Sequence, residues 1–359
     1  MPVHDTGSSR LFTMCSIAIV STVAIQNQMA AYRDFSRRRA SRYRRRVRDR
    51  PMEILTHLES PDVDAIARAF PNVTFTKVPM EGPLPDGARG EVCLTFAWGS
   101  PNMAEVVARG VEWVHTIGTG VDRFPLDAVR GALLTCSRGV SAIPIAEWTL
   151  AVMLAFEKQL PERFASAPPE RWNFAQLGGL HGRTLGLVGL GGIGCAIAER
   201  ARPFGMRVIA HRRTDAPSPV HGVEVVRDLD ALVAAADHLV LAASATPATR
   251  HLLDNARLAR VKPGVHVVNI ARGSLVDQDA LREALDDGRV ARASLDVCEP
   301  EPLPAGHWLY AHPKVRLSPH ISWSMPGALP MLFDTFRRNL GHWLAGEELE
   351  GRVDLERGY

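Results

Sequence analysis

A glycine-rich loop at residues 184–194 has the spacing of a phosphate-binding turn. The segment "TLGLVGLGGIG" contains the pattern GxGxxG directly after an apolar run and directly before a helical pattern. In such a turn the first glycine permits the tight bend, the second lets backbone N–H groups approach a pyrophosphate, and the third lets helix and strand pack closely. The phosphate then lies at the positive end of the helix, whereas the alternative is an ordinary tight turn. The residues expected to bind a dinucleotide are Gly189, Gly191, Gly192, Ile193 and Gly194.

Two arginines follow the next predicted strand, where an NAD-binding fold usually carries an acid. That Asp or Glu stands about 20 residues after the loop and binds the ribose 2′-hydroxyl, but Arg212 in "VIAHRR" takes its place here. A guanidinium cannot accept the hydroxyl proton, but its planar fork binds a 2′-phosphate well. Arg213 could add a second charge or stack on the adenine, or both arginines could be solvated surface residues. The replacement of the acid favours NADP over NAD as the cofactor.

The elements that must position this loop form two alternating series of strands and helices. The chain has 359 residues, 46% hydrophobic and 23% charged, which is enough for two domains with real cores. Alternation of short apolar runs with amphipathic stretches is typical of parallel βα units, so an α/β fold is predicted. The first series predicts strands at 53–57, 92–97, 112–117 and 132–135 and helices at 62–69, 102–109 and 143–160. The second predicts strands at 184–189, 206–211, 238–243, 264–270, 292–297 and 315–318, and helices at 192–204, 227–236, 249–260, 277–287 and 329–346.

The N-terminal 51 residues do not fit this pattern. Residues 11–25 are apolar but shorter than the ~20 residues of a membrane span. Residues 33–50 hold ten arginines against two aspartates, a local charge of +8, which leaves −5 for the rest of a chain whose net charge is +3. A signal anchor, a basic arm and sequence upstream of the true start are the alternatives, and we favour a disordered or non-native extension. The mildly acidic remainder indicates no nucleic-acid or membrane partner.

The cysteines and histidines suggest neither a disulfide framework nor a metal site. The five cysteines are far apart and form no CxxC or Cys/His cluster, so we expect reduced thiols in a cytoplasmic protein and no metal. Cys195, beside the glycine loop, is expected to be a small packing residue.

Three motifs follow the glycine loop in chain order: "VVNIARGSLVDQDAL", "ASLDVCEPEPLP" and "VRLSPHISW". With these motifs the sequence resembles the D-isomer-specific 2-hydroxyacid dehydrogenases over about residues 52–345. The segments "GTGVDRFPLDAV", "PIAEWTLAVML" and "SATPATRHLLD" are also similar to that family. The resemblance implies a Rossmann dinucleotide-binding domain (154–320) inserted into a flavodoxin-like catalytic domain (52–153 plus 321–359). It also implies a homodimer.

The resemblance further implies a catalytic triad. Arg272 would hold a 2-oxo acid, His320 would donate a proton to its carbonyl oxygen, and Glu301 would pair with His320. The chemistry asks for the same residue types, because a guanidinium binds a carboxylate through two parallel hydrogen bonds. Histidine is an acid poised near neutral pH, and a nearby carboxylate favours the imidazolium. Taken singly, each residue also has a structural explanation, such as a strand end or an exposed loop.

The same resemblance assigns the remaining site residues. Asp296 would hold the nicotinamide carboxamide, and Ile270 and Ala271 would line the cofactor through their backbones. Thr119 and Gly120 would offer backbone N–H groups to the substrate carboxylate. Trp98 would shape the substrate pocket or be a structural tryptophan, and Trp323 would narrow the pocket or pack against the last helix.

The function expected is therefore an NAD(P)-dependent 2-oxoacid reductase, an oxidoreductase that transfers hydride between nicotinamide C4 and substrate C2. Phosphite dehydrogenases share the scaffold and the triad, so phosphite oxidation is an alternative. Formate dehydrogenases typically lack the glutamate partner, so Glu301 argues against that branch. A dinucleotide-sensing corepressor is the non-enzyme alternative, and the basic N-terminal arm is its only support.

Overall fold

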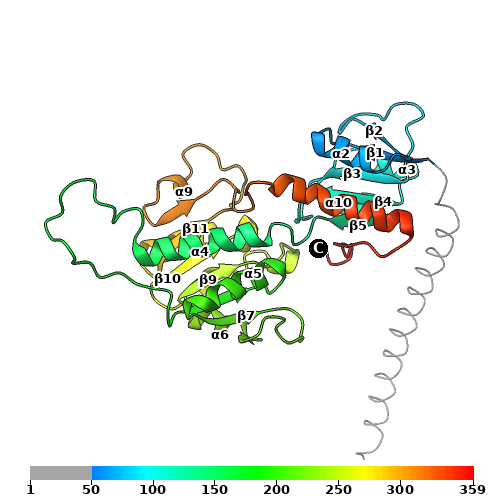
Figure 1. The fold of residues 1–359 in the computed structure, drawn as a ribbon. Coiled ribbons are helices and arrows are strands. Elements are labelled where there is room, and N and C mark those ends of the chain that lie inside the picture. The colour runs from blue at the N-terminus through cyan, green and yellow to red at the C-terminus, as the bar shows by residue number, and fades with distance from the viewer. Residues whose placement is uncertain (1–50) are drawn as a thin grey trace, which may run out of the picture.

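The computed structural model describes residues 51–359, which form two lobes, each built on one parallel sheet (Figure 1). The predicted N-terminal extension thus lies outside the described residues, except for Pro51 at its end. The strands of the first sheet are β1 (Met52–Thr56), β2 (Val73–Lys77), β3 (Val92–Phe96), β4 (Trp113–Ile117) and β5 (Leu133–Cys136). The helices that accompany it are α2 (Pro61–Ala69), α3 (Met103–Ala108) and α10 (Ala328–Ala345).

The second lobe contains the glycine loop. Its strands are β6 (Thr184–Val188), β7 (Arg207–His211), β8 (Val223–Val225), β9 (His238–Leu241), β10 (Val265–Asn269), β11 (Val290–Leu295) and β12 (Val315–Leu317). Its helices are α4 (Ala142–Lys158), α5 (Gly192–Ala201), α6 (Leu229–Ala235), α7 (Asn255–Leu258), α8 (Gln278–Asp286) and α9 (Trp308–Ala311).

The strand orders identify both sheets as doubly wound. The first sheet has the order β2-β1-β3-β4-β5 and the second β12-β11-β10-β9-β6-β7-β8. The first is the flavodoxin-like order, and the second is the Rossmann order with one strand added next to β11. The predicted α/β class with two doubly wound domains is confirmed. In the second sheet the order reverses between β6 and β9, and ligands bind at such a switch point outside the carboxyl ends of the strands.

Central strands of both sheets are buried because helices cover both faces. Strand β4 is buried along its whole length, and so is β10. Mostly apolar strands without exposed positions are typical of parallel sheets buried on both sides. Two edge strands, β2 and β8, were not predicted, and the helix predicted at 249–260 is wrong. Only α7 is helical there, because the chain turns at His251, which has a left-handed φ of 47°, and restarts at the N-cap Asp254.

The chain passes between the lobes at two places. It leaves the first lobe after β5 through residues 137–141 and returns through residues 318–327 to α10 (Figure 1). The predicted domain boundary at residue 153 falls inside α4. Buried residues of α4 such as Ala146 and Met153 pack in one apolar cluster with Ile197 of α5, so this helix packs with the second lobe.

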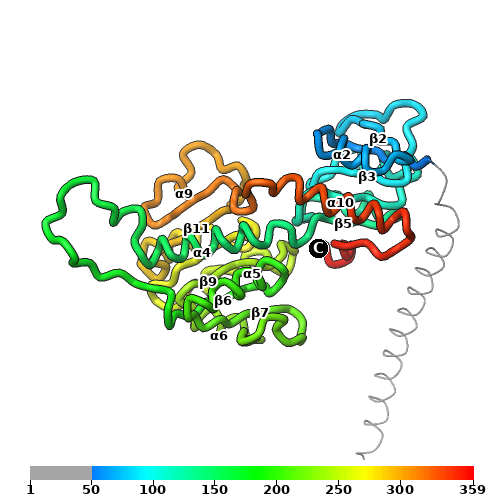
Figure 2. Tube along the Cα trace, in the orientation of Figure 1, coloured from blue at the N-terminus to red at the C-terminus, as the bar shows by residue number. Residues whose placement is uncertain are grey.

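Two further features of the described part of the chain concern its surface. Residues 159–183 form a long loop that extends away from the second lobe (Figure 2). None of the helices between residues 51 and 359 has the length and apolar character needed to cross a membrane.

Candidate active site

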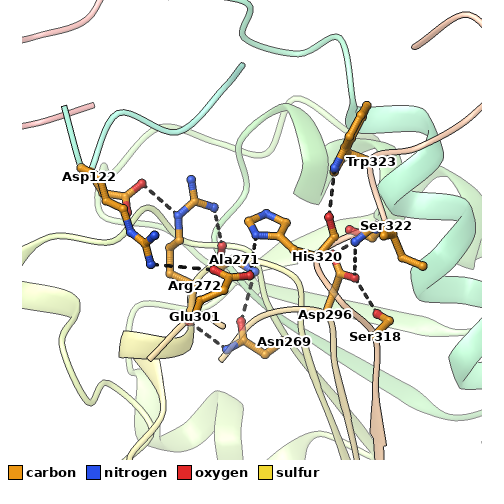
Figure 3. Close-up of polar contacts among 12 residues, drawn as sticks. Asp122, Asn269, Ala271, Arg272, Asp296, Glu301, Ser318, His320, Ser322 and Trp323 are labelled. Carbon is orange, nitrogen blue, oxygen red and sulfur yellow. Dashed lines mark hydrogen bonds and ion pairs between the residues drawn. The ribbon is translucent and has the colours of Figure 1, made fainter. Parts of the chain in front are cut away.

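The three motifs end up side by side at one edge of the second sheet. Strand β11 pairs in parallel with both β10 and β12, so the segments that follow these strands emerge together. Arg272 follows β10, Asp296 and Glu301 follow β11, and His320 follows β12 (Figure 3). Residues far apart in the sequence thus meet at the carboxyl edge, where α/β folds bind their ligands.

His320 and Glu301 form a close pair. The Nδ1 atom of His320 lies 2.8 Å from Oε1 of Glu301, and their side chains are 40% and 22% exposed. Because an ionised carboxylate can only accept, Nδ1 carries the proton in this contact, and the opposite ring atom, Nε2, is left for other partners. The pair has the form of an imidazole oriented by a carboxylate, which is a common arrangement for general acid–base work.

The backbone of His320 is held in an unusual conformation. Its φ of 56° lies in the left-handed region, which non-glycine residues seldom adopt. The N–H of His320 donates to the carbonyl of Asp296 at 2.9 Å, and its own carbonyl accepts from Nε1 of Trp323 at 3.0 Å. Strained residues of this kind persist where surrounding contacts over-determine them, often at functional sites. The hydrogen bond from Trp323 thus helps to hold the backbone of His320 in this conformation.

Asp296 is the anchor of the turn that carries His320. Its carboxylate is almost completely buried and accepts from Oγ of Ser318 at 2.5 Å, from N of Ile321 at 2.9 Å and from N of Ser322 at 3.0 Å. These bonds tie the end of β11 to the segment after β12. The expected contact of Asp296 with the nicotinamide carboxamide stays a prediction, whereas its structural role was not predicted.

Arg272 is oriented by contacts from both lobes. Asn269, the last residue of β10, donates from its side-chain amide to the carbonyl of Arg272 and accepts from N of Ala271. The guanidinium donates from Nη1 to the carbonyl of Ala271 at 2.7 Å and from Nε to Oδ1 of Asp122, in the first lobe, at 2.9 Å. A Cβ atom at position 120 would lie 1.7 Å from Nη2 of Arg272, so a side chain there would displace the guanidinium.

The other residues predicted to face the substrate come from the first lobe. Thr119 follows β4 next to Gly120, and its hydroxyl donates to the carbonyl of Ser137 at 3.3 Å. Trp98 follows β3, is 57% exposed and stacks on Phe96 with ring centroids 4.7 Å apart. Its indole therefore presents a free aromatic face to solvent.

The glycine loop has the shape that a pyrophosphate requires. A Cβ on Gly189, whose φ is 107°, would come within 2.6 Å of the carbonyl of Ala242, and one on Gly194 within 2.2 Å of the carbonyl of Gly189. Gly191 has nothing within 4 Å of such an atom. The first and last glycines thus allow close packing, and the middle one leaves backbone open at the start of α5. These residues fit a dinucleotide.

The remaining cofactor residues surround this loop. Gly192 and Ile193 open α5, and the buried residues Ile270 and Ala271 follow β10. Arg212 follows β7 and donates from Nη1 to the carbonyl of Pro217 at 2.9 Å. The guanidinium of Arg213 lies 4.9 Å from the ring of Tyr359, so the aromatic partner that it has in this structure belongs to the protein itself.

Two thiols lie close to the site. Burial and, second, the negative charge of Glu301 raise the pKa of Cys298 above its ordinary value. Burial and Glu199 raise the pKa of Cys195, although the charge of Arg212 opposes them. Thiols with raised pKa values stay neutral near pH 7, which indicates packing and not nucleophilic roles.

Within residues 51–359 no three His, Cys, Asp or Glu side chains gather as a metal site would require.

Comparisons with known proteins place this site in a family. The sequence profile described as "D-isomer specific 2-hydroxyacid dehydrogenase, NAD binding domain" matches residues 150–322. A glyoxylate reductase of Thermofilum pendens is 34% identical over 266 residues, which cover 70% of this chain and 78% of that protein. The chain belongs to the D-isomer specific 2-hydroxyacid dehydrogenase family. The second lobe is accordingly a nicotinamide-dinucleotide-binding domain.

Other members of this dehydrogenase family are similar to different extents. A D-3-phosphoglycerate dehydrogenase of Methanocaldococcus jannaschii is 35% identical over 255 residues, 69% of this chain, but the chain spans only 48% of that relative. Among solved structures, a D-isomer specific 2-hydroxyacid dehydrogenase of Xanthobacter autotrophicus, crystallised with NADPH and MES, is 26% identical. It covers 86% of this chain and is itself covered in full, with a TM-score of 0.75.

Three residues of the dehydrogenase site were missed from sequence. Asp122 accepts a hydrogen bond from the guanidinium of Arg272, and Asn269 donates one to the carbonyl of Arg272. Ser318 donates a hydrogen bond to the carboxylate of Asp296. Each lies inside a motif or directly at a strand end, and that position is the signal that could have marked them. Their partners, however, are set by packing between segments and lobes.

Proposed function

We propose that this protein is an NADPH-favouring 2-oxoacid reductase that acts as a D-2-hydroxyacid dehydrogenase. The observation that carries the proposal is the His320–Glu301 pair, with Nδ1 and Oε1 2.8 Å apart, beside Arg272 at the carboxyl edge of the cofactor sheet. Membership of the family and the glycine loop support it. The glyoxylate reductase among the relatives supports a small 2-oxo acid as substrate.

The residues have separate tasks in this reaction. Arg272 binds the carboxylate of the 2-oxo acid through its guanidinium, with backbone N–H groups of Thr119 and Gly120 on the other side. The nicotinamide, when bound, supplies the hydride that adds to C2. His320 gives a proton from Nε2 to the carbonyl oxygen, which yields the 2-hydroxy acid, and Glu301 keeps the ring oriented and compensates the charge of the imidazolium.

The direct test is the initial rate of NADPH and NADH consumption with glyoxylate, hydroxypyruvate, pyruvate and phenylpyruvate. Turnover of at least one of these acids, faster with NADPH, is the expected result. Bound cofactor without turnover of any 2-oxo acid would refute the reductase. It would direct the search to phosphite oxidation or to a sensing role without catalysis.

Arg212 is expected to determine the preference for NADPH. In Arg212→Asp the ratio of kcat/KM for NADPH to that for NADH should fall by about 10- to 100-fold, since a charge-assisted hydrogen bond to the 2′-phosphate is lost. The structure of the Xanthobacter autotrophicus relative with NADPH supports this choice of cofactor. Steady-state kinetics with both cofactors measure the ratio.

A second arginine of the same strand provides the control for this experiment. Arg207 begins β7 at the opposite end and pairs with Glu224 at 2.7 Å, so Arg207→Gln should leave the cofactor ratio unchanged. An unchanged ratio in Arg212→Asp itself would contradict the assignment.

We propose further that the protein forms a homodimer through the loop 159–183. Large apolar side chains on this loop are exposed: Phe164 (71%), Trp172 (75%), Phe174 (70%) and Leu177 (45%). An apolar groove between α4 and α5 on the same lobe includes Leu150, Leu154 and Phe204. Exposed apolar clusters of this kind mark interaction sites.

The free cysteines at 93, 136, 195 and 298 support a reducing compartment such as the cytoplasm.

The dimer is expected to dissociate when this loop is made polar. The double variant Trp172→Glu, Phe174→Glu should elute as a monomer in size-exclusion chromatography with light scattering, because burying unpaired charges in an apolar interface is costly. Tyr310→Arg alters an aromatic residue that is 57% exposed on α9 and should remain dimeric. A monomeric wild-type protein would refute the dimer.

A further inference from the structure

Asp122 is the one carboxylate of the first lobe that contacts the predicted substrate-binding arginine in the described structure. It stands after β4, 150 residues before Arg272 in the chain, and accepts a hydrogen bond of 2.9 Å from Nε of that arginine. Both side chains are largely shielded, with exposed fractions of 27% for Arg272 and 23% for Asp122. The contact joins the two lobes directly at the site (Figure 3).

The position of a negative charge here needs an explanation. An acid beside a guanidinium that must bind a substrate carboxylate repels that carboxylate, since like charges oppose each other. Affinity for the substrate is therefore reduced unless Asp122 also improves the orientation of the guanidinium.

The contacts of Arg272 leave Nη2 of its guanidinium available to a ligand. Nε is bonded to Asp122 and Nη1 to the carbonyl of Ala271, while Nη2 lies next to Gly120, 1.7 Å from where a Cβ atom would stand. Fixing Nε and Nη1 fixes the plane of the group, because guanidinium is rigid and planar. Asp122 thus holds Nη2 against the backbone of residues 119–120, the segment predicted to bind the same carboxylate.

We propose that Asp122 is a positioning residue that aims Arg272 at the substrate carboxylate. This inference rests on the proposed reductase function and deepens it. The carboxylate site is then made jointly by both lobes: Arg272 comes from one, and Asp122 with the 119–120 backbone comes from the other. A hydrogen-bond acceptor at the position of Oδ1 is what the proposal requires, and the negative charge is not.

The test compares Asp122→Ala, which removes the acceptor, with Asp122→Asn, which keeps it and removes the charge. In Asp122→Ala we expect the KM of the turned-over 2-oxo acid, and the Kd of oxalate for the NADPH-loaded protein, to rise by about tenfold or more, with a smaller change in kcat. Asp122→Asn should lie within about threefold of the wild type. The Kd of NADPH should stay the same in both variants.

A double-mutant cycle shows whether Asp122 acts through the arginine. Arg272→Lys removes the Nε donor, so in that background the change Asp122→Ala should no longer alter the Kd of oxalate. The matched control is Asp127→Ala, in the same segment, because Asp127 is 89% exposed and pairs with Arg130. This control should have wild-type KM and oxalate affinity.

The outcomes separate this inference from the proposed function. If the wild type reduces a 2-oxo acid and binds oxalate, but Asp122→Ala has the same KM and oxalate Kd, the positioning role is overturned and the reductase stands. An equal effect of Asp122→Ala in the Arg272→Lys background also overturns it. A wild type that neither reduces a 2-oxo acid nor binds oxalate would overturn the reductase and this inference together.

Discussion

His320→Ala should lower kcat by about 10³-fold with little change in the affinity for NADPH, since removal of a general acid typically costs 10²- to 10⁴-fold. The expectation follows from the pair that His320 makes with Glu301 at 2.8 Å and from the free side of its ring. Stopped-flow measurement of NADPH oxidation, together with cofactor titration by fluorescence, gives both quantities on the same preparation.

A second histidine of the same lobe gives the control for this loss. His312 lies after α9 and before β12, at the other end of that strand from His320, and its Nε2 contacts Oδ1 of Asp286 at 3.1 Å. His312→Ala should keep wild-type kcat. A His320→Ala protein that retains wild-type kcat would refute the role of His320, and with it the direction of proton transfer proposed here.

Arg272→Ala is expected to lower kcat/KM by about 10³-fold, because both the charge and the hydrogen bonding of Nη2 to the carboxylate are lost. Most of the loss should lie in KM, since the carboxylate is bound in the ground state and in the transition state alike. Steady-state kinetics over a wide range of substrate concentration measure the change, and added guanidinium should restore part of the rate.

The control for the arginine is Arg250→Ala. Arg250 pairs with Glu299 at 3.0 Å in the same lobe, yet it is 55% exposed and does not contact Arg272 or His320 in any bond that the structure shows. Its removal should leave kcat/KM close to that of the wild type. Wild-type kcat/KM in Arg272→Ala would exclude the arginine as the carboxylate ligand.

The central strands of both sheets could be predicted from sequence because they are continuous apolar runs between amphipathic stretches. The edge strands β2 and β8 were missed; β2, with the sequence VTFTK, has only one neighbouring strand, and only its first residue is buried. Residues 249–260 show a helical period, but the left-handed His251 stops the helix, and periodicity does not detect such a turn. The backbone turn at His251, and not the helical period of the sequence, determines where the helix begins there.

The proximity of three predicted site residues could be foreseen from sequence, because each follows a strand of the same parallel sheet. Arg272, Glu301 and His320 stand at strand ends, and parallel strands bring their ends together. The contact between Asp122 and Arg272 was not predictable, because it depends on how two separately folded lobes meet. For Asp296 the sequence could not show that its carboxylate is already bonded to three groups of the chain.

The two passages of the chain between the lobes also define how the lobes can turn. A body attached at a single point can swing in any direction, whereas one attached at two points has a single rotational degree of freedom, about the line that joins them. One passage is residues 137–141, and the other, residues 318–327, contains His320. The predicted proton donor therefore lies in one connection, while the first-lobe segment of Gly120 and Asp122 adjoins the other through the bond from Thr119 to Ser137.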